Sequence, residues 1–258
     1  MEIKMKHLLK YEFRKTRTIK TAVLISTCIF EILFLLGLIC NVPVLLGMGT
    51  MGLTSCATLG MLILGLVSIA VLYRELNSPQ SYMLFLTPNS SYKIIGAKVL
   101  ENGITLAGGG ICFTVLAGID LFLWGVQASD FPTVMHLLSD MMGNIQTNPA
   151  DIARILLVLF SGWLSVLTIA FFAVVVQASL LNGRRFGGLF SFLLFLAIVV
   201  GIGIFISNLP LGQGFLGSFL QSMVVPVSTG FLYSLLYLGF TALFYALTGW
   251  IMDKKLSV

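Results

Sequence analysis

The chain has 258 residues, of which 58% are hydrophobic and only 10% carry a charged side chain. Soluble globular domains average about 25% charged residues, so this composition excludes an ordinary soluble domain and indicates an integral membrane protein. The formal net charge is +5, but the basic residues cluster between long apolar runs. That distribution favours a role in membrane topology over nucleic-acid binding.

Six apolar runs are long enough to cross a bilayer as helices, which takes about 20 residues at a rise of 1.5 Å each. Water cannot satisfy backbone groups inside the hydrocarbon, so helices are expected throughout. We therefore predict an all-α, polytopic membrane protein whose residues 1–258 form a single transmembrane domain. The predicted spans are residues 21–41, 50–72, 94–122, 154–181, 187–207 and 229–251.

The Lys and Arg residues predict the orientation of these spans. Fourteen of the fifteen fall in the amino-terminal arm, the 73–98 segment, the 182–186 turn or the carboxyl-terminal tail. Only Arg154, at the start of the fourth span, lies on the opposite side. Because basic residues are retained on the cytoplasmic side of a membrane, both termini are predicted to be cytoplasmic.

The arm itself, residues 1–20, has an apolar face and a strongly basic remainder. This pattern is typical of an amphipathic helix that lies on an anionic membrane surface. The residues expected to anchor the arm at that surface are Lys10, Arg14, Lys15, Arg17 and Lys20.

A polar, proline-punctuated stretch, RELNSPQSYMLFLTPNSSYKIIGAK (74–98), separates the second and third runs. Ser78 before a proline is a helix-start signal, and Pro88 is a stop signal for the residue before it. These signals predict a helix of about two turns, which is too short to be stable alone. Its apolar side chains, YMLFL (82–86), must therefore be buried. They either lie against the bilayer surface or the arm, or dock into a cytoplasmic partner.

The arm segment LLKYEFRKT and the later segment LYRELNSPQSYMLFLTPNSSYKIIGAK resemble the ABC-2 type permeases, membrane subunits of bacterial ATP-binding-cassette exporters. The likeness covers roughly the first 100 residues by local pattern and the remainder by six-span topology. It implies a bacterial cell-membrane location, a second permease copy or related permease, and cytoplasmic ABC ATPase subunits that hold Mg-ATP. It also implies a coupling helix that sits in a groove of the ATPase. The residues that would form this helix are Ser78, Pro79, Gln80, Ser81, Tyr82, Met83, Leu84, Phe85 and Leu86.

Other sequence motifs argue against catalysis, cofactor binding and metal binding in this chain. No G-x-x-x-x-G-K-[ST] phosphate loop occurs, so ATP hydrolysis is expected in a partner and no cofactor in this chain. The glycine motif GMGTMG (47–52) lacks the strand and helix context of a dinucleotide site, so it is interpreted as a turn or a close helix approach. With only two histidines, His7 and His136, neither an enzyme active site nor a metal site is predicted.

The resemblance predicts export of an amphipathic peptide, lipid or drug-like substrate. The alternative is a non-transporting membrane protein, such as an immunity, sensory or structural subunit. A membrane-embedded enzyme is the third and weakest hypothesis.

Charged residues within spans are costly, at about 2.5–3.5 kcal/mol on insertion scales, and so have functional interest. Glu31, in the first span, either lines a translocation path or makes a helix-packing hydrogen bond, including as the neutral acid. Glu101 lies one turn after Lys98, which predicts an ion pair. Asp120 is predicted to reach the outer interface, and Gln177 to bond between helices.

Overall fold

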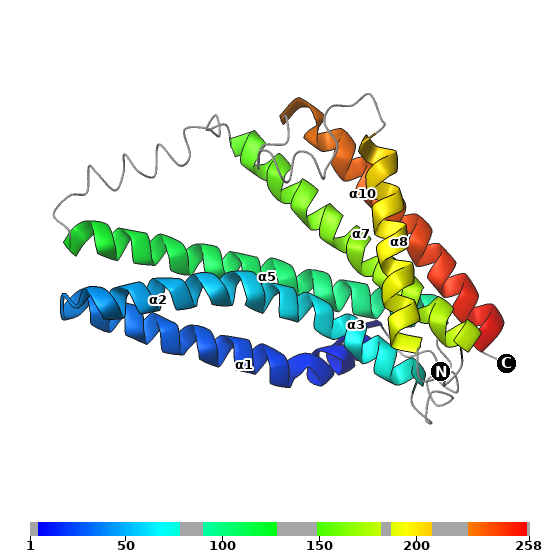
Figure 1. Ribbon diagram of the computed structural model, residues 1–258, viewed down its shortest axis with the longest axis horizontal. Helices are drawn as coiled ribbons and strands as arrows, with labels where there is room; N and C mark the ends of the chain where they lie inside the picture. Colours follow the sequence, from blue (N-terminus) through cyan, green and yellow to red (C-terminus); the bar gives the residue numbers. More distant parts are fainter. Residues whose placement is uncertain (1–4, 78–89, 128–148, 182–186, 208–226, 257–258) are drawn as a thin grey trace. The chain divides into compact units, whose positions relative to one another are not determined.

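The computed structural model describes residues 5–77, 90–127, 149–181, 187–207 and 227–256. Nearly all of these residues are helical and none lies in a strand, which confirms the all-α prediction. Six helices within these ranges are long and apolar enough to cross a membrane. The protein is therefore a multi-pass helical membrane protein. In chain order the helices are α1 (Met5–Ile39), α2 (Pro43–Ser55), the π-helical η1 (Cys56–Gly60), α3 (Met61–Asn77), α5 (Ser91–Gln127), α7 (Pro149–Leu181), α8 (Gly187–Ser207), α10 (Val227–Ile251) and the π-helical η2 (Met252–Leu256) (Figure 1).

The largest differences from the predicted boundaries occur in the first two spans. The arm and the first span form one continuous helix, α1, so no helix boundary separates them at residue 21. The second span begins at Pro43, seven residues before the predicted position 50. Proline is well suited to the first position of a helix, and the residues that follow it are apolar. The fifth span agrees with its predicted ends at 187 and 207.

A tight turn joins α1 to α2. Asn41 has a left-handed backbone conformation, with φ of 53°. The Asn41 N–H donates to the Leu38 carbonyl at 3.3 Å, and the Val42 N–H donates to the Gly37 carbonyl at 3.0 Å. This pair of bonds is the Schellman arrangement that ends many helices, with asparagine in the position usually taken by glycine. Pro43 then starts α2 in the opposite direction.

The chain divides into two compact units, and the boundaries between them fall inside α1, α3 and α5. Unit 1 contains Met1–Leu9, Ile69–Leu100 and Thr147–Val258. Unit 2 contains Lys10–Ser68 and Glu101–Gln146.

In unit 2, glycines bring α2 against α1. A Cβ atom added at Gly49 would lie 2.6 Å from the Phe34 backbone, and one added at Gly52 would lie 2.0 Å from the Phe30 ring. Only residues without side chains fit such distances, and small residues allow membrane helices to approach closely. The interpretation of the 47–52 motif as a close helix approach is confirmed.

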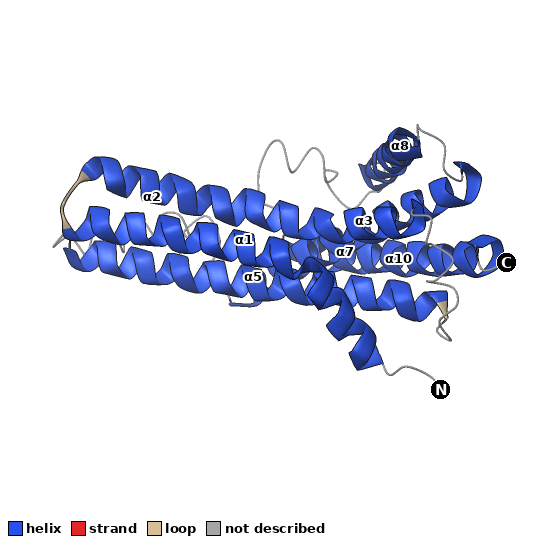
Figure 2. Cartoon of the chain, turned by 90° about the horizontal axis from the view of Figure 1, so that it is seen from below, coloured by secondary structure: helices blue, strands red, loops and turns tan. Residues whose placement is uncertain are grey.

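Helix α5 runs alongside α1 in the same unit, and Figures 1 and 2 both show α1, α2 and α5 side by side. Residue numbers rise together along the contacts between α1 and α5, so these two helices are parallel. Three interhelical pairs follow one another in this register: Lys20–Glu101, Glu31–Asp120 and Leu38–Gln127.

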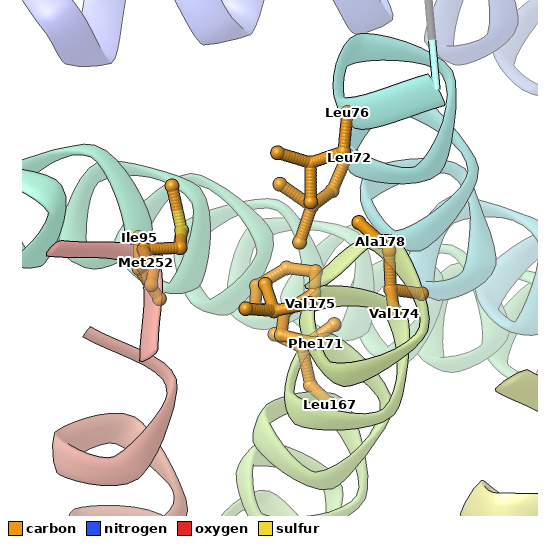
Figure 3. Close-up of a cluster of buried hydrophobic side chains, with 9 residues drawn as sticks. All are labelled: Leu72, Leu76, Ile95, Leu167, Phe171, Val174, Val175, Ala178 and Met252. Atoms are coloured by element: carbon orange, nitrogen blue, oxygen red, sulfur yellow. The ribbon is translucent and has the colours of Figure 1, made fainter. Parts of the chain in front are cut away.

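Unit 1 is organised around α7, which packs against α10 and α8. Its main core joins side chains from α3, α5, α7 and η2 (Figure 3). Lipid tails are as apolar as these side chains, so this cluster holds the helices together through van der Waals packing rather than through exclusion from water. The buried members are Leu72, Leu76, Ile95, Leu167, Phe171, Val174, Val175, Ala178 and Met252.

Candidate functional site

Glu101, on α5, is the centre of a buried polar network in unit 2. Only 2% of the residue is exposed. Its carboxylate accepts hydrogen bonds from Thr16 at 2.8 Å, from Ser68 at 3.0 Å and from Thr105 at 3.3 Å. It also forms an ion pair with Lys20. A buried carboxylate is tolerated only when it is paired and hydrogen-bonded, and Glu101 meets both conditions.

Asn102 extends this network to the backbone of α3. It is fully buried, and its amide nitrogen lies 3.1 Å from both the Gly65 carbonyl and the Ser68 hydroxyl. The network thus ties three helices together, because Lys20 comes from α1, Ser68 from α3 and Glu101 from α5. Its donors and acceptors satisfy one another, which gives it a structural role.

The predicted ion pairing of Glu101 is confirmed, but its partner is Lys20 rather than Lys98. The Lys98 ammonium lies 2.9 Å from the Glu75 carboxylate in unit 1, and the Lys98 side chain is only 1% exposed. Two residues one turn apart on a helix can pair, but charges on neighbouring helices offer a competing arrangement.

The Lys98–Glu75 pair belongs to a set of polar contacts at the ends of α3 and α5. Asn77 and Gln177 exchange amide hydrogen bonds at 3.3 Å, and Gln177 is fully buried. This confirms the prediction that Gln177 bonds between helices. The contacts fix the last turn of α3 to α7.

The first turn of α5 is fixed to the last part of the chain. The Ser91 N–H donates to the Asp253 carboxylate at 3.3 Å. The Tyr245 hydroxyl donates to the Tyr92 carbonyl at 2.7 Å, and the two rings lie 6.1 Å apart. We call these four contacts, Lys98–Glu75, Asn77–Gln177, Ser91–Asp253 and Tyr92–Tyr245, the polar frame.

The polar frame holds the two helix ends between which the predicted coupling helix lies. That helix, Ser78–Leu86, falls outside the described residues, so its docking stays a prediction. The helix that follows begins directly after Ser90, whose carbonyl accepts the first bonds from Lys93 at 2.9 Å and Ile94 at 3.3 Å. Helix α5 therefore begins with its first backbone hydrogen bonds in place.

Glu31 meets another acid. Its carboxyl group and that of Asp120 on α5 are close enough to share a hydrogen bond. Asp120 therefore turns toward α1, a contact that its predicted place at the outer interface did not include. One oxygen of each carboxyl, Oε2 of Glu31 and Oδ1 of Asp120, is buried and accepts no hydrogen bond within the described part of the chain.

Two of the five residues predicted to anchor the arm have partners within the protein. Lys20 pairs with Glu101 and lies over the Phe13 ring, and Lys15 pairs with Glu12 at 3.3 Å. The other three, Lys10, Arg14 and Arg17, are exposed, and their contact with a membrane surface stays a prediction.

Sequence reasoning missed the partners of Glu101 and, apart from the interhelical bonding of Gln177, the contacts of the polar frame. The available signal was the pair Glu101–Asn102, two adjacent polar residues in a largely apolar run, which had to find partners on neighbouring helices. Comparison of the chain with family models, with curated proteins and with solved structures found no match.

Proposed function

We propose that this chain is the permease subunit of an ATP-binding-cassette exporter, driven by a separate cytoplasmic ATPase that hydrolyses Mg-ATP. In this proposal two permease subunits, identical or related, face each other in a bacterial cell membrane with their termini in the cytoplasm. The exported substrate is an amphipathic peptide, a lipid or a drug-like molecule.

The observation that carries the proposal is the polar frame. A segment that receives force from an ATPase must be attached to helix ends that do not fray. Helix ends normally lose order first because their terminal backbone groups lack helical partners. Here the ends of α3 and α5 are held by a partly buried ion pair, a partly buried amide pair and two further hydrogen bonds.

Movement of Ser78–Leu86 would thus be transmitted to α3 and α5 as whole helices. Both helices continue from unit 1 into unit 2 without a break. Displacement of their ends by an ATPase would therefore also reach Asp120, the α5 member of the Glu31–Asp120 pair. The resemblance of the 73–98 segment to permease coupling loops supports the same role.

The proposal is tested by photo-crosslinking in cells. A photoreactive amino acid placed at Phe85 of the full chain is expected to crosslink to a polypeptide with a phosphate-binding loop. ATPase activity should then co-purify with the wild-type chain, while Tyr82→Asp and Phe85→Asp should lower it at least fivefold because a charge is introduced into an apolar contact. The matched control is Phe131→Asp, in a connection predicted to lie on the opposite side, which should leave the activity unchanged.

Two results would contradict the proposal. One is a wild-type chain that retains no ATPase, and the other is retention that both substitutions leave intact. Either result would favour the non-transporting membrane protein.

A further inference from the structure

A cavity of about 490 Å³ lies within unit 2, between α1, the α2–η1 run and α5. Its walls are mostly aliphatic and aromatic, and Phe34, Phe113 and Trp124 are among the lining side chains. Binding sites for drug-sized molecules typically have volumes of about 300–1,000 Å³ and a few polar groups in an apolar wall. Asp120 is the charged residue in the lining.

Among the described residues, neither Glu31 nor Asp120 forms an ion pair with a basic side chain. Glu31 is the only charged residue between positions 21 and 73, and Asp120 is the only one between 102 and 127. The nearest basic residue along α1 is Lys20, about 16 Å before Glu31 at 1.5 Å per residue, and it is paired with Glu101. The other titratable groups on these stretches bring no positive charge: Cys28, Cys40, Cys56, Cys112 and Tyr73.

The two hydroxyl groups in the cavity wall do not donate to the Glu31–Asp120 pair either. Thr50 donates to the Gly47 carbonyl at 3.0 Å, and Thr54 donates to the Thr50 carbonyl at 2.8 Å. Their hydrogens are thus used within α2. Within the described residues, no hydrogen bond reaches Oε2 of Glu31 or Oδ1 of Asp120.

Two carboxyl groups this close in a poorly polarisable environment cannot both be ionised without a counter-charge. A proton shared by the pair can supply this counter-charge when no ligand is bound. A bound monocation could take the place of this proton, and an apolar cation would at the same time fill the apolar part of the cavity.

We propose that this cavity binds an organic cation with apolar substituents, which enters as one proton leaves the Glu31–Asp120 pair. The exchange is one positive charge for another, so the net charge of the site stays constant. The site belongs to the chain alone and does not depend on an ATPase.

The test is equilibrium binding of tetraphenylphosphonium to the purified full chain in dodecyl maltoside, an uncharged detergent without lipid amines. We expect one site per chain. Because a proton competes with the ligand, the affinity should fall at least tenfold between pH 8 and pH 6. Calorimetry in two buffers with different ionisation enthalpies should show about one proton released per cation bound.

Asp120→Asn and Glu31→Gln should each weaken binding at least tenfold and remove its pH dependence. Asp151→Asn, which removes an acid outside unit 2, is the matched control and should bind as the wild type does. Ala57→Phe fills the cavity without altering either acid, and it should also abolish binding. This variant keeps the proposal testable if an acid substitution prevents folding.

Tetraphenylborate, an anion of the same shape, separates charge recognition from shape recognition. It should not bind. Equal binding of both ions would show that the cavity recognises apolar shape alone and would overturn the proposal. Absence of saturable phosphonium binding, or binding that is unchanged in folded acid variants, would also overturn it.

Discussion

Removing the ammonium group of Lys20 should destabilise the protein much more than neutralising its partner. The Glu101 side chain is 3% exposed, whereas the Lys20 side chain is 22% exposed. Lys20→Met would leave a buried carboxylate with hydroxyl donors but no cation. Loss of one member of a buried pair costs about 3–5 kcal/mol, and the retained hydroxyl bonds favour the lower end, about 3 kcal/mol.

The reverse change, Glu101→Gln, leaves Lys20 without its carboxylate. Lys20 is partly exposed and can keep its ammonium hydrated, so the cost should be near that of a surface pair, about 1 kcal/mol. The double variant should be nearly as stable as Glu101→Gln alone, because no charge is then stranded. The expected coupling between the two sites is about 3 kcal/mol.

The assay is unfolding of the purified chain by sodium dodecyl sulfate in mixed micelles, followed by circular dichroism and converted to free energies. Equal destabilisation by the two single substitutions would refute the reasoning, since it would mean that burial of the carboxylate does not decide the cost. A loss of less than 1 kcal/mol for Lys20→Met would refute it as well.

Two further predictions use the same unfolding assay. Gly49→Leu should cost at least about 2 kcal/mol, because its Cβ would meet the Phe34 backbone at 2.6 Å and force α1 and α2 apart. Gly47→Leu is the control: a Cβ at this position meets nothing within 4 Å, so it should change stability by less than about 1 kcal/mol. Asn41→Val should cost about 1–2 kcal/mol at the left-handed turn position, whereas Asn41→Gly should stay within about 0.5 kcal/mol of the wild type. Similar losses for the two Asn41 variants would point to the side chain rather than the backbone conformation.

The number of spans could be predicted from sequence because the membrane imposes a simple rule. Every backbone group in hydrocarbon must be satisfied within a helix, so long apolar runs identify spans almost directly. Helix ends follow local rules that hydropathy does not capture. The arm continues into α1 because nothing between its basic residues and the apolar run breaks a helix, and α2 starts early because Pro43 is a favourable first residue.

The sequence could predict that charged residues within the spans have partners on other helices, but not which residues those partners are. Glu31 and Glu101 each had to find a partner because an isolated charge is costly in a membrane. Which partner each finds depends on helix register, and register is set by packing features such as the close contact of Gly49 with α1. Local spacing suggested Lys98 for Glu101, but the tertiary arrangement places Lys20 beside it.

The two acidic sites along α1 and α5 differ in one respect that assigns them different roles. Glu101 has a cation and three hydroxyl donors, so its charge is neutralised within the chain and its network can only hold helices in place. Within the described residues the pair Glu31–Asp120 has neither, and Asp120 lines a cavity. The pair also lies between two fixed points on the same parallel helices, the Glu101 network before it and the bond from the Gln127 amide to the Leu38 carbonyl after it. Helices held on both sides keep the distance between the two carboxyl groups nearly constant, which is the preorganisation that a cation site requires.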